Sequence, residues 1–162
     1  MTNVSLRPVC DTDLDIFFEQ SLDPEANHMA AFVGEDPTDR GPFDRRWAKI
    51  RSQPTWLART IVVTGDDGTE HIAGTICSFE MEGDAEVTYW LGREFWGKGI
   101  ATRALELFLQ EHTPRPIFGR AAKDNIASIR VLEKCGFTWL RDERGYAPAR
   151  GKEIDEVVMV LP

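Results

Sequence analysis

A glycine-bearing turn joins a predicted strand directly to a predicted helix in the middle of this chain. The strand covers residues 86–91 and the helix residues 100–112, with Gly97 and Gly99 between them. The first N–H groups of a helix have no partners within it, and the helix dipole is positive there. Glycine lets a phosphate approach the backbone because it has no Cβ. The segment therefore predicts a binding site for a phosphate or pyrophosphate group.

Several patterns compete for this segment. A P-loop is one, but Gly99 stands where that loop needs a Ser or Thr to hold Mg²⁺. Gly97-x-Gly99-x-x-Thr102 is a broken dinucleotide-binding fingerprint, and no simple strand–helix–strand unit begins the chain. The third pattern is a glycine loop that follows a β-meander. A glycine turn that binds no ligand is the structural alternative.

The charge balance limits the partners of the chain. It has 19 Lys and Arg against 27 Asp and Glu, so its formal net charge is −8. Proteins that bind nucleic acid or anionic membranes without specificity need a basic face. We therefore expect no nucleic acid and no membrane among the partners. The charge is compatible with a cationic acceptor such as an amine, although many soluble proteins are acidic for solubility alone.

The cysteine pattern and the apolar runs indicate a cytoplasmic protein. Cys10, Cys77 and Cys135 are widely spaced and form no C-x-x-C pair, which is typical of reduced thiols. No apolar run approaches the roughly 18 residues of a membrane span, and the first residues do not resemble a secretory signal. The three histidines lack ligand spacing, so we expect no metal. A monomer and a homodimer both stay open.

Hydrophobic periodicity and turn residues predict a mixed sheet with helices. The length of 162 residues favours one domain. Helical spacing of apolar residues predicts helices at about 12–20, 43–51, 100–112 and 126–134. β-rich runs predict strands at 4–9, 56–64, 72–81, 86–91, 117–121, 137–142 and 156–161. Loops are expected at 22–42, with one helical turn within 24–31, and at 143–155. The class is therefore α+β, or α/β with a mixed sheet.

A set of motifs occurs in the order and at the spacings of one known family. The set comprises Leu6-Arg7-Pro8 with Asp13, residues 86–92, Trp96-Gly97-Lys98-Gly99, Asp124-Asn125-Ile126-Ala127-Ser128, Leu132-Glu133-Lys134-Cys135-Gly136-Phe137 and Gly151-Lys152-x-x-Asp155. It resembles the GNAT superfamily of N-acetyltransferases, and within it the RimJ/RimL-like branch. The resemblance covers nearly the whole chain and is weakest at residues 22–55.

The resemblance implies a fold, a reaction and a coenzyme site. The fold would be the GNAT-type acyl-CoA N-acyltransferase fold, a central mixed sheet of about six to seven strands flanked by about four helices, in one domain over residues 1–162. An acetyl group would pass from acetyl-CoA, the cosubstrate, to a primary amine of a protein N-terminus or a small molecule, by direct attack on the thioester. The coenzyme would lie where the strands at 86–91 and 117–121 splay apart. The residues implied to bind it are Tyr89, Trp90, Leu91, Trp96, Gly97, Lys98, Gly99, Ile100, Ala101, Thr102 and Asn125.

The resemblance also implies how the leaving thiolate is protonated. Many members use a Tyr on the last core helix, where this chain has Leu132. Ser128 matches a serine that the RimL branch places near the coenzyme sulfur, so we expect Ser128 to donate this proton. Both Asn125 and Ser128 also suit a helix start, so helix capping is the structural alternative for each.

The general base is expected to be a carboxylate near the splayed strands. Glu86 shares a strand face with Thr88 and Trp90 and is expected to act through water, with Glu80 and Glu82 as other candidates. The missing Tyr also leaves a second function open. The chain would then be a catalytically silent acyl-CoA-binding sensor or interaction module.

Overall fold

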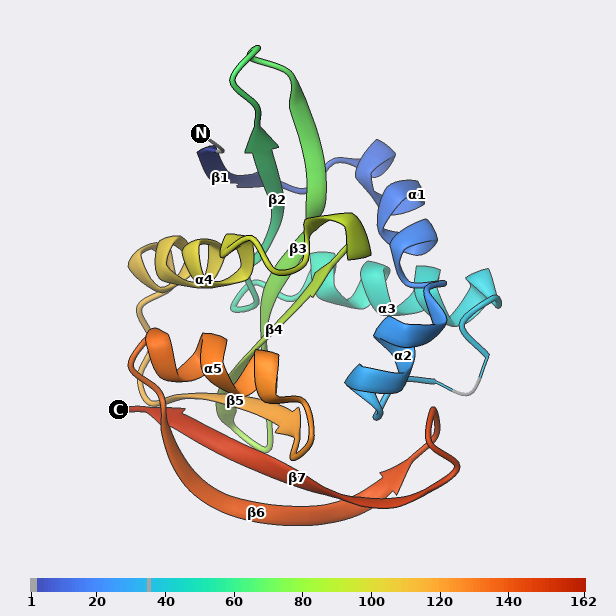
Figure 1. Ribbon diagram of the computed structural model, residues 1–162, viewed down its shortest axis with the longest axis vertical. Coiled ribbons are helices and arrows are strands. Elements are labelled where there is room, and N and C mark those ends of the chain that lie inside the picture. The colour runs from blue at the N-terminus through green and yellow to red at the C-terminus, as the bar shows by residue number, and fades with distance from the viewer. Residues whose placement is uncertain (1–2, 35) are drawn as a thin grey trace.

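Seven strands and five α-helices make up the regular structure of residues 3–34 and 36–162 in the computed structural model (Figure 1). The strands are β1 (Asn3–Pro8), β2 (Ala58–Thr64), β3 (Glu70–Met81), β4 (Asp84–Leu91), β5 (Ile117–Ala122), β6 (Thr138–Ala147) and β7 (Lys152–Leu161). The helices are α1 (Asp11–Gln20), α2 (Pro24–Ala30), α3 (Arg40–Ser52), α4 (Ile100–Glu111) and α5 (Ile126–Lys134), with a short 3-10 helix, η1 (Arg93–Phe95).

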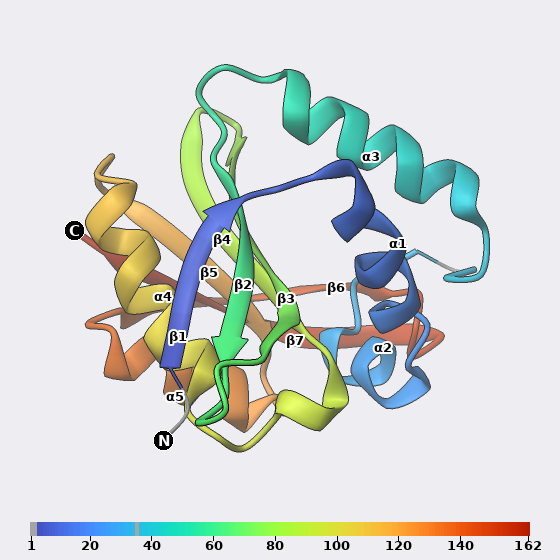
Figure 2. The same ribbon diagram turned by 90° about the horizontal axis from the view of Figure 1, so that it is seen from above.

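The strands form one mixed sheet in the order β1-β2-β3-β4-β5-β7-β6. Only β4 and β5 run parallel, and every other neighbouring pair is antiparallel. Helices α1, α2 and α3 lie on one face of the sheet, and α4 and α5 lie on the other (Figure 2). The predicted α+β class with a mixed sheet is therefore confirmed.

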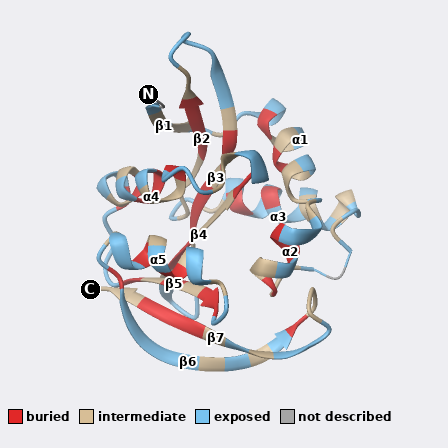
Figure 3. Cartoon of the chain, in the orientation of Figure 1, coloured by how far each residue is buried: buried red, intermediate tan, exposed pale blue. Residues whose placement is uncertain are grey.

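The main core lies between the sheet and the pair α4 and α5. Helix α4 buries Ala104, Leu105 and Phe108 completely, at the helical spacing that the sequence shows. Helix α5 adds Ile129 and Leu132. A smaller cluster joins α1 and α3 to the opposite face of the sheet. In Figure 3 the buried residues gather on the central strands and on parts of the helices that pack against them. One face of β4 therefore faces helices α4 and α5, and the other faces helices α1, α2 and α3.

The number of helices differs from the expected four because α2 is a full helix. It covers seven residues inside a segment expected to be mostly loop. The side chain of Asp23 caps it by accepting a hydrogen bond from the backbone N–H of Glu25, and Pro24 occupies the first turn, where its missing N–H costs nothing. Helix α3 also begins earlier than predicted, at Arg40, and Asp39 caps it in the same way. Helix α1 begins at Asp11, with Cys10 at its N-cap position, close to the predicted start at about residue 12.

The C-terminal part also differs from expectation, because most of the predicted loop at 143–155 belongs to a hairpin. Strands β6 and β7 pair from Thr138 with Val160 to Ala147 with Lys152. Most of β6 is exposed, since it is an edge strand with one neighbour (Figure 3). Its charged residues find partners across the hairpin, as in the ion pair of Arg144 with Asp155 at 3.0 Å. Because β6 carries charged residues on both faces, its sequence does not alternate between polar and apolar residues, and this part of the strand was not predicted.

Candidate active site

Strands β4 and β5 separate after three residue pairs. The pairs are Ala85 with Ile117, Glu86 with Phe118 and Val87 with Gly119. Beyond them β4 continues to Leu91 and β5 to Ala122 without pairing to each other, while β4 stays paired with β3. The divergence predicted from the sequence is therefore present. The backbone groups of residues 88–91 that face β5 have no partner on that strand and can bind an extended ligand.

The glycine turn lies between this strand and α4. Both Gly97 and Gly99 have positive φ angles, 71° and 76°, and a Cβ placed on either would meet nothing within 4 Å. Gly99 is the N-cap of α4, so no side chain caps the helix there, and no acidic residue lies in its first turn. The first N–H groups of α4 are thus open to an anion, as the sequence predicts.

The other residues predicted to bind the coenzyme surround this turn in different ways. Ile100 buries its side chain in the core, so only its backbone can serve a ligand. Lys98 is exposed, and Ala101 and Thr102 are partly buried. The indole of Trp96 donates a hydrogen bond to the carbonyl of Leu91 at 3.1 Å and holds the turn against the end of β4.

A pair of hydroxyl groups bridges β4 and α5 beside the splayed strands. The Tyr89 and Ser128 oxygens lie 2.9 Å apart. Burial raises the pKa of Tyr89 to about 12, so its hydroxyl stays protonated at neutral pH. The sequence assigned Tyr89 only a backbone role and did not predict this contact. A tyrosine of β4 and a serine of α5 therefore bring two hydroxyl groups together beside the splayed strands.

Of the two residues that could cap the start of α5, only Asn125 does so through its side chain. Asn125 caps the helix, because its side-chain oxygen accepts a hydrogen bond from the backbone N–H of Ser128 at 3.3 Å. Its amide nitrogen donates to the carbonyl of Met29 at 3.4 Å, which links α5 to α2. The hydroxyl of Ser128 turns to Tyr89 instead. Leu132 is buried in the core against β5, where a Cβ on Gly119 would lie 2.7 Å from its methyl carbon.

Glu86 lies in a buried cluster of charges on the opposite face of β4 from Tyr89. Arg120 of β5 donates to Glu86 at 2.7 Å, to Glu143 at 2.8 Å and to Glu156 at 3.0 Å. Burial alone would lower the pKa of Arg120, but these hydrogen bonds raise it above its usual value. Burial also raises the pKa of Glu156. Glu143 also pairs with Arg141 at 2.6 Å. Three carboxylates thus meet two guanidiniums, so the cluster, when fully ionised, keeps one negative charge in excess.

The sequence analysis did not identify Arg120, although one signal was present. Arg120 is the one charged residue of the short strand β5, whose neighbours are small or apolar. A charge in such a strand indicates buried partners. The alternative bases lie elsewhere: Glu80 accepts a hydrogen bond from Thr55, and Glu82 is exposed in the turn between β3 and β4.

The described residues contain neither a helix suited to a membrane nor a cluster suited to a metal ion. No helix there has both the length and the apolar character needed to cross a bilayer. No group of three or more His, Cys, Asp or Glu side chains in the same part of the chain is arranged to hold a metal ion.

Comparison with known proteins places the chain in a family. Residues 3–138 match the family model described as an acetyltransferase (GNAT) domain. The uncharacterized N-acetyltransferase p20 of Bacillus licheniformis is 33% identical over 101 residues, which cover 57% of this chain and 56% of that protein. The match therefore spans little more than half of the relative's length.

Solved structures share the fold at low sequence identity. Spermidine N-acetyltransferase from Vibrio cholerae, in complex with CoA and spermine, is 19% identical, with a TM-score of 0.77 over 98% of this chain and 94% of its own. Mycobacterium smegmatis RimJ, in complex with CoA-disulfide, is 21% identical, with a TM-score of 0.77 over 98% of this chain and 81% of its own. The family match and the shared fold lead to one conclusion: this chain belongs to the GNAT acetyltransferase family.

Proposed function

We propose that this protein is an N-acetyltransferase that moves an acetyl group from acetyl-CoA to a primary amine. One arrangement carries the proposal. The unpaired stretch of β4 contains Tyr89, whose hydroxyl meets that of Ser128, and it leads along the chain into the glycine turn at the open N-terminus of α4. An anion site, an extended backbone edge and a proton donor thus follow one another along a single path. The CoA bound to the V. cholerae and M. smegmatis proteins supports the choice of coenzyme.

Acetyl-CoA would bind chiefly through backbone groups. Its pyrophosphate would accept hydrogen bonds from N–H groups of residues 96–102, with Gly97 and Gly99 leaving room for it. Its pantetheine arm would pair with the backbone of Tyr89, Trp90 and Leu91 as an added strand. Two side chains would add contacts at the edges of the site. Lys98 would lie beside the phosphates, and Asn125 would contact the pantetheine arm near the sulfur.

The transfer needs two proton movements. The amine nitrogen bonds to the thioester carbonyl carbon and the C–S bond breaks. One proton leaves the nitrogen and one reaches the sulfur. A backbone N–H of β4 would stabilise the oxyanion. Ser128, held by Tyr89, would protonate the thiolate. Glu86 would take the amine proton through water, and its cluster would favour the approach of a cationic amine.

Finer assignments follow from the motifs. We place the chain in the RimJ/RimL-like branch, as one domain over residues 1–162 in the cytoplasm. The acceptor would be a protein N-terminus or a small amine. The motifs of the glycine turn and of α5 support the branch, and the likeness to RimJ in fold is consistent with it.

A coupled assay tests the proposal against the alternative of a silent binding module. Purified protein is mixed with acetyl-CoA and a panel of amines, and released CoA is measured, while acetyl-CoA binding is followed by the melting temperature. We expect binding and amine-dependent release. Binding without release for any amine would favour the sensor, and no binding would overturn both readings.

A further inference from the structure

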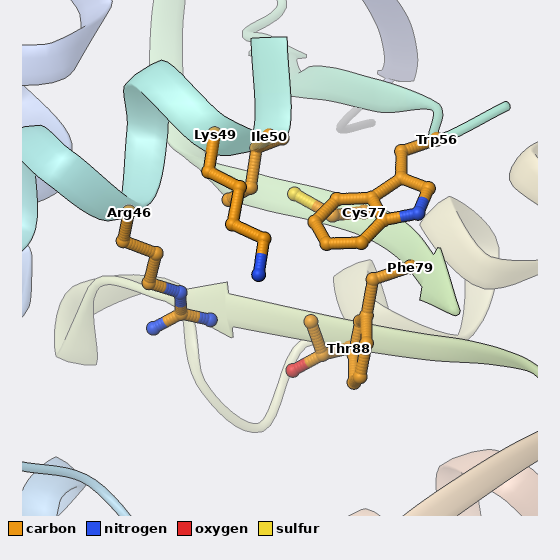
Figure 4. A pocket seen from close by; sticks show the side chains of 7 residues that line it. All are labelled: Arg46, Lys49, Ile50, Trp56, Cys77, Phe79 and Thr88. Carbon is orange, nitrogen blue, oxygen red and sulfur yellow. The ribbon is translucent and has the colours of Figure 1, made fainter. Parts of the chain in front are cut away.

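A small cavity opens on the face of the sheet that carries α3. Its volume is about 210 Å³, and its walls come from α3, the following loop, β3 and β4 (Figure 4). Thr88 closes it on the side of β4, and Thr88 is the first residue of β4 beyond its pairing with β5. None of its lining residues belongs to the predicted coenzyme site. The cavity therefore reaches the splayed strands from the side opposite Tyr89 and Ser128.

The charges at this cavity are positive, in contrast to the chain as a whole. Arg46 and Lys49 extend from α3 into the same space above Thr88 (Figure 4). Neither forms an ion pair with a carboxylate in residues 3–34 and 36–162, whereas most of the arginines there do. The ammonium group of Lys49 lies 5.6 Å from the ring centre of Trp56, which holds it at the cavity. Two unpaired cations side by side are suited to bind an anion.

The other residues that line the cavity carry no negative charge that would repel an anion. Trp56 and Phe79 meet edge to face, with ring centres 6.2 Å apart, and Ile50 adds an aliphatic wall. Burial raises the pKa of Cys77 to about 11, so this thiol is neutral at physiological pH. The cavity thus combines an apolar interior with two cations at its mouth.

A negatively charged residue, Glu86, lies on the same face of β4 as Thr88. Glu86 precedes Thr88 by two residues, so the two side chains point to the same side of the sheet. Glu86 belongs to the cluster in which three carboxylates share Arg120. Glu86 is buried and does not line the cavity, so its cluster would act on an acceptor here only through its charge, with the two cations at the other end.

We infer that the acceptor is a small primary amine that carries an anionic group, such as a carboxylate or phosphonate, at its other end. This inference rests on the proposed function. The anionic group would lie between Arg46 and Lys49, and the amine would lie near Thr88, where the strands diverge. The cavity is smaller than the pockets of about 300–1,000 Å³ that hold drug-sized ligands, so an amino-acid-sized molecule fits its volume. The pair of cations disfavours polyamines.

Matched amines test the inference. We would compare 5-aminopentanoate, pentylamine and 1,5-diaminopentane, which share one chain, and add 3-aminopropylphosphonate with propylamine. The readout is CoA release at varied amine concentration. We expect kcat/KM to be about tenfold or more higher for the anionic amines than for their uncharged counterparts, mostly through KM, and lowest for the diamine.

Variants of α3 make the test specific. Arg46→Ala and Lys49→Ala should each lower kcat/KM for 5-aminopentanoate about tenfold more than for pentylamine. Lys49→Glu should shift the preference toward the diamine. Arg45→Ala is the matched control, because Arg45 is exposed on the same helix and does not line the cavity.

A binding measurement separates this inference from the proposed function. Calorimetric titration of 5-aminopentanoate into the CoA complex should show binding that Arg46→Ala weakens about tenfold and Arg45→Ala does not. Amine-dependent CoA release without preference for the anionic amines would overturn the inference alone. Equal binding by the Arg46→Ala variant and the unmutated protein would overturn it even if no amine were acetylated.

Discussion

The hydroxyl oxygens of Tyr89 and Ser128 lie 2.9 Å apart although 39 residues separate them in the chain. Tyr89 comes from β4 and Ser128 from the first turn of α5, so the hydrogen bond crosses from the sheet to the helix that packs on it. Because burial keeps the Tyr89 hydroxyl protonated, the pair holds protons beside the unpaired backbone of β4. A general acid at this place would serve the leaving sulfur of a thioester.

The first prediction concerns Ser128→Ala. A positioned general acid contributes about 10²–10⁴-fold to a rate, so we expect kcat to fall by about 10²-fold with a confirmed acceptor. Tyr89→Phe removes only the hydroxyl that orients Ser128, and we expect a smaller loss of about tenfold. Steady-state kinetics and melting temperatures of both variants check this.

Ser21→Ala is the matched control for these variants. The Ser21 hydroxyl donates to the carbonyl of Phe18 at 2.6 Å at the end of α1. Its removal should cost about 1 kcal/mol of stability and leave kcat unchanged. An unchanged kcat in Ser128→Ala with a lowered melting temperature would make Ser128 a structural residue and remove it from the mechanism.

The second prediction concerns the turn before α4. Saturating acetyl-CoA, at about a hundred times its Kd, should raise the free energy of unfolding by about 2.7 kcal/mol. Gly99→Glu should abolish this rise, because it adds a side chain and a negative charge where the pyrophosphate would bind. Thermal unfolding with and without acetyl-CoA measures the effect.

Gly68→Glu separates the loss of binding from strain. Gly68 also has a positive φ angle, 80°, and open space around its Cβ position, but it lies in the turn between β2 and β3. Both substitutions should cost about 1–2 kcal/mol of backbone strain, and only Gly99→Glu should lose the response to the coenzyme. Retention of the full response in Gly99→Glu would rule out this turn as the pyrophosphate site.

Local sequence signals predicted the elements that have strong periodicity or clear caps. Helix α5 was predicted with its observed bounds because Asn125 caps its start, and Gly136, with a φ angle of 95°, follows its end. Helix α2 was expected only as a single helical turn within residues 24–31, because seven residues between loops carry little periodic signal. Strand β6 was predicted too short, with the residues after 142 expected to form a loop. Its charged residues show no strand pattern by themselves, and they find partners only when β6 pairs with β7.

The site was predictable only in part, for a related reason. The glycine turn and the strand before it are continuous in sequence, so the order of strand, glycine turn and helix could be predicted directly. The contacts of Tyr89 with Ser128 and of Arg120 with Glu86 join residues 39 and 34 positions apart. Such contacts depend on which strands and helices become neighbours in the folded protein. Residue spacing within one helix or strand therefore cannot predict them.

The third prediction concerns Arg120→Met. Removing the guanidinium leaves Glu86 and Glu156 near one another without a cation, while Glu143 keeps its pair with Arg141, and this should cost about 3–5 kcal/mol at neutral pH. Burial already raises the pKa of Glu156, and without the hydrogen bond from Arg120, which lowers it, that pKa should rise further above its unfolded value. A group with a raised pKa contributes stability below its unfolded pKa and loses it as pH rises, so the defect should shrink near pH 4.

Urea unfolding of the Arg120→Met variant at acidic and neutral pH checks the sign of this dependence. Arg144→Met is the control, because Arg144 pairs with Asp155 on the exposed edge strand. We expect it to change stability by no more than about 0.5 kcal/mol at either pH. A defect in Arg120→Met that stays constant with pH would mean that the carboxylates separate or are hydrated once the arginine is lost.

The fourth prediction concerns Asp13, which fastens α1 to β1 and β2. Its buried carboxylate accepts hydrogen bonds from both terminal nitrogens of Arg7, at 2.7 and 2.9 Å, from the backbone N–H of Cys10 at 2.9 Å, and from the hydroxyl of Thr60 at 2.7 Å. Burial alone would raise the pKa of Asp13, but these hydrogen bonds lower it from 3.8 to about 2. A lowered pKa means that the ionised carboxylate stabilises the fold above about pH 4, and that this contribution is lost as pH falls toward 2.

Asp13→Asn isolates that contribution. The variant should lose about 2 kcal/mol of unfolding free energy near pH 6, and its difference from the unmutated protein should shrink steadily between about pH 4 and pH 2. Asp11→Asn is the matched control, since Asp11 is exposed on the same helix and should contribute no more than about 0.5 kcal/mol through its pair with Arg51. Urea unfolding of all three proteins across this range gives the differences directly. A difference that stays the same from pH 6 to pH 2 would show that the stability comes from hydrogen bonds that the amide also makes, and not from the ionised state of Asp13.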